Sequence, residues 1–143
     1  MVCVLVVDDE MSVRSVLRRK LESMGHRVLD ASGGREALRI LESQRPDIAM
    51  IDVLMPEMDG IEVIKEFRRN ANRFPIIAMP AQGTAKSSWY GDIAKMFGAQ
   101  DVLEKPFTPS DVEAIVDRVI KQSKRKDYLN QIALVPKRSP AKK

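Results

Sequence analysis

The sequence feature that most constrains the fold is a short apolar run that ends abruptly in acidic residues. Residues 2–7 (VCVLVV) are uniformly apolar and rich in valine, and Asp8, Asp9 and Glu10 follow at once. Such a run is typical of a strand that is buried on both faces, as in a parallel sheet. Because parallel strands need helical crossovers, this run favours an α/β fold.

Helical stripes and further apolar runs alternate behind this first strand. One helix is predicted by a stripe with helical spacing that stops at Gly25: Val13, Val16, Leu17, Leu21 and Met24. The last helix is predicted from Thr108 as N-cap and Pro109 at the first helical position. That last helix continues through the apolar stripe of 112–120, the remaining strands are expected at 27–30, 48–51, 75–79 and 101–104, and the remaining helices near 37–41, 61–67 and 90–97. This order predicts a doubly wound parallel sheet with helices on both faces.

The net charge of +4 is distributed unevenly along the chain. Residues 1–120 carry 16 basic and 19 acidic residues, whereas residues 121–143 carry 8 basic residues and 1 acidic residue. We therefore expect a slightly acidic domain over residues 1–123 and a basic, disordered tail over residues 124–143. The tail is too short for a second folded domain, so no DNA-binding output module is expected in this chain.

Cysteine and histidine usage narrows the chemistry further. A single cysteine excludes an internal disulfide, and a single histidine leaves no Cys/His cluster for structural zinc. The apolar start is too short for a signal-peptide core or a membrane span. The sequence therefore predicts a cytoplasmic protein without membrane insertion.

Charged residues follow three of the predicted strands. Asp8 and Asp9 follow the first strand, Asp52 the third and Lys105 the fifth. We expect these positions to converge, because the carboxyl ends of parallel strands meet at one edge of the sheet. The functional sites of such sheets lie just beyond that edge. Each pair of carboxylates repels by roughly 1 kcal/mol in water and about 4 at a protein surface, which favours a bound Mg²⁺ or Mn²⁺. A carboxylate, a divalent ion and a lysine are the groups needed for phosphoryl transfer to aspartate.

These motifs together resemble the receiver domain of two-component response regulators, over residues 1 to about 123. The resemblance rests on four segments with matching separations: residues 6–10 (VVDDE), 51–56 (IDVLMP), 59–60 (DG) and 105–107 (KPF). It implies a flavodoxin-like, five-stranded sheet with the strand order 2-1-3-4-5.

The resemblance also implies a role for each matching residue. Asp52 corresponds to the phosphoacceptor, and Asp8 and Asp9 correspond to the metal-binding acidic pair. Lys105 corresponds to the lysine that contacts the phosphoryl group, and the bond after it is expected to be cis. The backbone carbonyl of Leu54 is expected to complete the Mg²⁺ ligands together with Asp52.

Two positions depart from the family pattern. Pro80 stands where a threonine or serine is usual, so one hydroxyl donor to the phosphoryl group is absent, although the N–H of Ala81 remains a candidate donor. Val102 stands where a switch aromatic is usual. Trp89 and Tyr90 nearby are either a partner-binding patch or ordinary helix packing.

Three functional hypotheses follow from these residues. The leading one is a stand-alone receiver that takes a phosphoryl group from a sensor histidine kinase or a histidine phosphotransfer protein and signals to a protein target. Its own catalysis would be limited to self-phosphorylation and slow autodephosphorylation, and nucleic acid is not an expected partner. The rival is a receiver-like interaction module that does not depend on phosphorylation. A weaker alternative is a metal-dependent hydrolase that forms an aspartyl phosphate.

Overall fold

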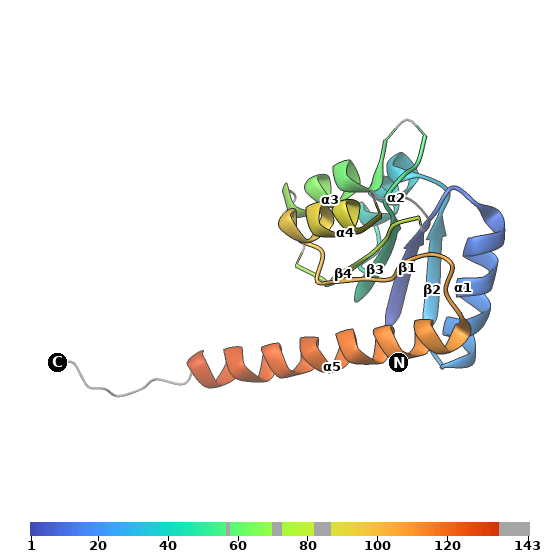
Figure 1. The fold of residues 1–143 in the computed structure, drawn as a ribbon. Coiled ribbons are helices and arrows are strands. Elements are labelled where there is room, and N and C mark those ends of the chain that lie inside the picture. Colours follow the sequence, from blue (N-terminus) through green and yellow to red (C-terminus); the bar gives the residue numbers. More distant parts are fainter. Residues whose placement is uncertain (57, 70–72, 82–86, 135–143) are drawn as a thin grey trace.

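The computed structural model describes residues 1–56, 58–69, 73–81 and 87–134. A five-stranded parallel sheet forms its centre, with helices packed on both faces (Figure 1). The strand order is β2-β1-β3-β4-β5, which confirms the predicted flavodoxin-like topology. The strands are β1 (Cys3–Val7), β2 (Arg27–Ala31), β3 (Ile48–Asp52), β4 (Ile76–Met79) and β5 (Asp101–Val102).

The helices divide between the two faces of the sheet. They are α1 (Met11–Ser23), α2 (Gly34–Leu41), α3 (Gly60–Arg69), α4 (Ser87–Met96) and α5 (Pro109–Leu134). Alternate residues of β1 point to opposite faces, so Val4 and Val6 pack with α1 and α5. Leu5 and Val7 belong to the core beneath α2, α3 and α4. The uniformly apolar sequence of β1 therefore reflects burial on both sides.

The register of the strands brings their carboxyl ends to one edge of the sheet. Val7 lies opposite Ile51 in the β1–β3 pair, so the next residues, Asp8 and Asp52, are neighbours. Asp52 in turn lies opposite Met79 of β4. The residues that follow these strands therefore share one end of the molecule.

The start of α5 follows its predicted capping pattern. The backbone N–H of Asp111 donates to Oγ1 of Thr108 at 3.1 Å, and the N–H of Thr108 donates to the Asp111 carboxylate at 2.9 Å. This reciprocal pair satisfies two backbone donors at the helix end. Strand β5 ends at Val102 and is therefore shorter than the expected 101–104. The backbone N–H of the next residue, Leu103, still donates to the Ala78 carbonyl of β4 at 2.8 Å.

Helix α5 is longer than its apolar pattern indicated. It continues to Leu134, so residues 124–134 are helical where disorder was predicted. This stretch contains good helix formers and lacks both glycine and proline. The next proline along the chain is Pro136. The end of α5 projects away from the body of the domain (Figure 1). The rest of the expected tail, residues 135–143, lies outside the described residues.

Within the described ranges, no helix combines the length and the apolar character that a membrane crossing requires.

Candidate functional site

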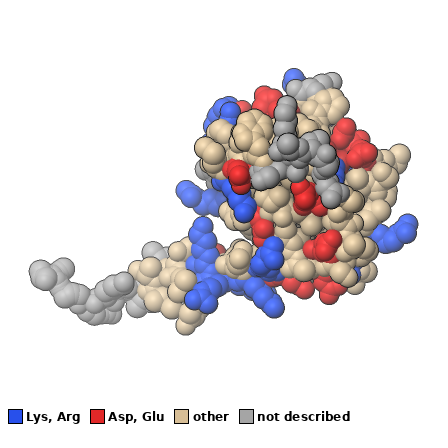
Figure 2. All heavy atoms as spheres, viewed as in Figure 1, with Lys and Arg blue, Asp and Glu red and all other residues tan. Residues whose placement is uncertain are grey.

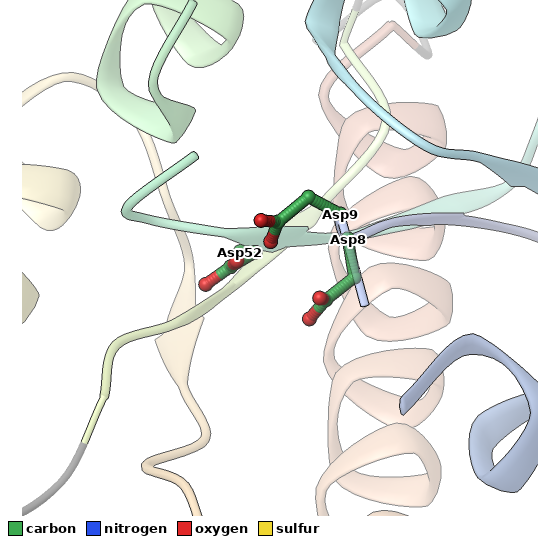
Figure 3. A group of neighbouring side chains, drawn as sticks. All are labelled: Asp8, Asp9 and Asp52. Carbon is green, nitrogen blue, oxygen red and sulfur yellow. The ribbon is translucent and has the colours of Figure 1, made fainter. Parts of the chain in front are cut away.

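Four of the predicted residues meet at the carboxyl edge of the sheet, and we call them the strand-end cluster: Asp8, Asp9, Asp52 and Lys105. Ligand oxygens of the three aspartates lie within 4.8 Å of one another. Figure 3 shows the three side chains where β1 and β3 end. The Lys105 Nζ lies 2.8 Å from Oδ2 of Asp8 and 3.3 Å from Oδ1 of Asp52. The structure thus brings together residues that are up to 97 positions apart in the sequence.

Burial makes the charges of this cluster costly. Asp8 is 0% exposed and Asp52 is 4% exposed. Burial, followed by the charge of Asp8, raises the pKa of Asp52 to about 7, although Lys105 acts in the opposite direction. Burial alone lowers the pKa of Lys105, but its contacts with Asp8 and Asp52 outweigh that effect and raise it. One lysine therefore leaves negative charge in the cluster that a further cation would balance.

The donor set of the cluster fits a hard divalent cation. All three side chains offer carboxylate oxygens, the ligands that Mg²⁺ prefers. Asp9 is exposed while Asp8 and Asp52 are buried, so the group has a side open to solvent, from which a metal ion and its waters can enter. The cluster can therefore hold a metal ion, as the sequence predicted for these three aspartates.

Backbone and side-chain contacts from α1 fix the position of Asp8. The Arg14 Nη1 donates to the backbone carbonyl of Asp8 at 2.8 Å. The backbone N–H of Glu10 donates to Oδ1 of Asp8 at 2.9 Å, and the Glu10 carboxylate lies 3.8 Å from the Lys105 Nζ. The sequence pattern did not identify Arg14 as a site neighbour. Arg14 stands one helical turn after Glu10, and this spacing is the feature of the sequence that could have identified it as a neighbour of the site.

The start of α3 packs directly against the backbone of Asp52. The N–H of Gly60 donates to the Val53 carbonyl at 2.7 Å. A Cβ added to Gly60 would lie 2.1 Å from the Asp52 carbonyl oxygen and 2.7 Å from the Val53 Cα. Only glycine fits this close approach, and this steric limit explains why glycine follows Asp59 in the sequence.

The remaining predicted site residues lie in the loops around the cluster. Leu54 follows Asp52 by two residues, and its side chain is 47% exposed. Ala81 is exposed directly after the buried Pro80. The Pro80 carbonyl accepts a hydrogen bond from the Lys105 N–H at 3.0 Å, and the Lys105–Pro106 bond is cis as expected. The contacts of Leu54 and Ala81 with a metal ion or a phosphoryl group stay predictions.

The position that usually carries the family's switch aromatic is occupied by a small side chain here, Val102. Val102 is half-buried, and a Cβ added to Gly91 of α4 would lie 3.4 Å from its Cγ1. Tyr90 packs against the core, in agreement with the packing alternative. Trp89 is 54% exposed and meets the Tyr90 ring edge-on, with the ring centroids 5.0 Å apart. We call the packing of Gly91 on Val102 the α4–β5 contact.

The sequence also matches known proteins over most of its length. The model of the response regulator receiver domain matches residues 4–117. The chain is 40% identical over 121 residues to the alkaline phosphatase synthesis transcriptional regulatory protein PhoP of Bacillus subtilis, covering 84% of this chain and 49% of that protein. It is 36% identical over 131 residues to the response regulator MprA of Mycobacterium avium, covering 92% and 56%. The chain thus spans about half the length of the curated relatives it matches.

Solved structures show the same fold. The chemotaxis protein CheY4 of Vibrio cholerae superposes with a TM-score of 0.74 at 34% identity, covering 83% of this chain and 98% of that one. The receiver domain of Francisella response regulator 1452 superposes with a TM-score of 0.77 at 28% identity, covering 86% and 99%.

Proposed function

The chain belongs to the receiver domain family of two-component response regulators, and we propose that its Asp52 accepts a phosphoryl group from a phosphohistidine on a partner protein. In this step an oxygen of the Asp52 carboxylate forms a P–O bond while the P–N bond to the donor imidazole breaks. The imidazole leaves with the electron pair of that bond. The product is an acyl phosphate on Asp52.

The observation that carries this proposal is the contact of one buried carboxylate with a lysine in a cluster that opens to solvent. Lys105 lies 3.3 Å from Oδ1 of Asp52, so its ammonium group is placed to meet the oxygens of a group bound there. Asp8, Asp9 and Asp52 would hold Mg²⁺, with the Leu54 carbonyl as a further ligand. When bound, Mg²⁺ supplies positive charge that offsets the negative charge of the phosphoryl oxygens.

A cavity next to Lys105 supports docking of a protein donor. It has a volume of about 410 Å³ and lies between α1 and the segment that follows β5. Most of its lining is apolar: Ser12, Val13, Val16, Lys105, Pro106 and Phe107. An apolar surface beside the acceptor site suits a histidine kinase or phosphotransfer protein, which must place its phosphohistidine over Asp52. Two of the relatives named above are regulators longer than this chain. A downstream protein target is therefore proposed for the whole protein and not for this chain alone.

The test is phosphorylation by a small phosphodonor with Mg²⁺, followed by intact-mass measurement. The wild type is expected to gain the mass of one phosphoryl group, and Asp52→Asn is expected to gain none. Asp92→Asn on the exposed surface of α4 makes the same chemical change away from the cluster, so it should behave as the wild type. No gain in the wild type, or an equal gain in Asp52→Asn, contradicts the proposal.

A phosphorylation-independent interaction module is the second candidate, and Pro80 and Val102 favour it. Neither side chain offers the hydroxyl or the ring that the family pattern uses to change its surface. In this case a beryllofluoride mimic of the phosphoryl group would leave the backbone amide spectrum unchanged outside the cluster. Changes that reach α4 or β5 would instead support phosphorylation-dependent signalling.

A further inference from the structure

The projecting end of α5 exposes apolar side chains that no other described element covers. We call residues 124–134 the projecting segment. Tyr128 is 63% exposed, Leu129 is 50% exposed and Ile132 is 47% exposed. An isolated helix of this length is marginal in water, so a partner surface would stabilise the segment.

These apolar residues form a stripe that is distinct from the core stripe of the same helix. At about 100° per residue, Tyr128, Leu129, Ile132 and Ala133 share one side of the projecting segment. This side is turned by roughly 120° from the residues of α5 that pack on the sheet, which are Val112, Ile115, Val116 and Val119. The exposed stripe is therefore no continuation of the domain's own core stripe.

The charges of the projecting segment are sorted in the same way. Lys124, Arg125 and Lys126 precede the apolar stripe by one turn, and all three are exposed. On the same wheel, at about 100° per residue, they lie over and beside the stripe, whereas Asp127, Asn130 and Gln131 occupy the opposite side. No described carboxylate forms an ion pair with these three cations. In Figure 2, basic residues gather where α5 leaves the body, and uncharged residues follow toward its end.

We propose that the projecting segment docks on an anionic phospholipid surface, with Tyr128, Leu129 and Ile132 in the apolar boundary and Lys124, Arg125 and Lys126 at the lipid phosphates. A basic amphipathic helix of this kind is suited to lie in the plane of a membrane interface. The arrangement needs no groove in the partner, and the end of α5 projects away from the body of the domain (Figure 1). The proposal is independent of phosphoryl transfer to Asp52.

Two other occupants fit the segment less well. In a complex with a nucleic acid, Leu129 and Ile132 would lie against phosphates, where apolar side chains gain no free energy of burial. A second copy aligned in parallel on the same face would bring three cations against three like cations. An anionic bilayer is the surface that satisfies both the charge and the apolar stripe.

The test is co-sedimentation of the full chain with two kinds of vesicle. Binding is expected with vesicles that contain phosphatidylglycerol and not with vesicles of phosphatidylcholine alone. The double variant Leu129→Glu/Ile132→Glu should weaken binding far more than the control Asn130→Glu/Gln131→Glu, which makes the same charge change on the opposite side. Replacing Lys124 and Lys126 with glutamine should weaken binding by roughly fivefold for each charge removed.

Several results would overturn the proposal. One is absence of binding to the phosphatidylglycerol vesicles. Equal binding by the two double variants would show that charge alone holds the chain at the surface. Self-association or DNA binding that Leu129→Glu/Ile132→Glu abolishes, without vesicle binding, would assign the stripe to a second copy or to nucleic acid. Circular dichroism of each variant checks that the domain stays folded, so that lost binding reports on the segment itself.

Discussion

The strand-end cluster and the α4–β5 contact lie at the same edge of the sheet but differ in how tightly they are packed. A Cβ on Gly60 would collide with the Asp52 backbone at 2.1 Å, whereas a Cβ on Gly91 would meet Val102 at an ordinary 3.4 Å. The cluster also matches the family pattern residue by residue, while Pro80 and Val102 depart from it.

This difference separates two tasks that the family pattern normally joins. Holding a phosphoryl group requires charges at fixed positions, and the cluster supplies them from three strand ends. Passing a signal to the surface requires an element with two arrangements, and the usual hydroxyl and ring for that are absent here. The proposed phosphorylation of Asp52 is therefore compatible with a different consequence at the surface.

The pH dependence of stability tests the charge of the cluster in the metal-free protein. Asp52 has its pKa raised from 3.8 to about 7, so the folded chain holds a proton that the unfolded chain releases between these values. Stability contributed by protonated Asp52 is therefore present at low pH and lost as the pH rises through about 7. Asp52→Asn should remove this pH-dependent loss of unfolding free energy. At about 1.4 kcal/mol per pKa unit, the loss is worth up to about 4 kcal/mol.

Urea unfolding with a chelator at several pH values between about 4 and 8 measures this effect. The free energy of unfolding of Asp52→Asn minus that of the wild type should grow as the pH rises. Asp92→Asn serves as the control, because Asp92 is exposed on α4. A difference that is flat in pH would show that Asp52 is charged throughout the range, contrary to its crowded position.

Gly60→Ala tests the steric limit of the cluster. The added methyl group would press on the backbone of Asp52 and Val53, so either α3 or β3 must shift. We expect a loss of about 3 kcal/mol in unfolding free energy, the upper range for overpacking. Gly33→Ala is the matched control, since no atom lies within 4 Å of its added Cβ and its φ of −173° is extended. Equal stability of the two variants would contradict the close approach of α3.

The sequence predicted the parts of this molecule that repeat or that carry charge. The alternation of buried strands and amphipathic helices specifies the sheet, and the acidic residues after β1 and β3 specify the cluster, because burial and charge are strong constraints. The length of α5 could not be predicted from apolar spacing, since residues 124–134 are helical through backbone propensity rather than through packing on the sheet. Arg14 was missed for a related reason. Its position on a polar helix face does not reveal that its guanidinium reaches the Asp8 carbonyl.

Pro80→Thr tests whether the missing hydroxyl limits the chemistry. The register of β3 with β4 places Pro80 one residue beyond the partner of Asp52, so a hydroxyl there would reach toward a phosphoryl group. We expect phosphorylation by a small donor to become about tenfold faster, a smaller change than the loss usually caused by removing one such donor. Pro80→Val has nearly the same shape as threonine without the hydroxyl, and intact-mass time courses compare the two. Equal rates for both variants would show that the hydroxyl has no part.

Gly91→Ala tests the looser region and should have the smallest effect, in the opposite direction to Gly60→Ala. Gly91 lies inside α4, where glycine is less favourable than alanine by roughly 0.5–1 kcal/mol. The new methyl group would lie 3.4–4.0 Å from the Val102 side chain, which is ordinary contact. The unfolding free energy is therefore expected to rise by about 0.5 kcal/mol. The same substitution in a Val102→Ala background should give the same gain, because the benefit comes from the helix and not from the contact. A loss that disappears in that background would show that α4 presses on β5, and the two regions would then be packed alike.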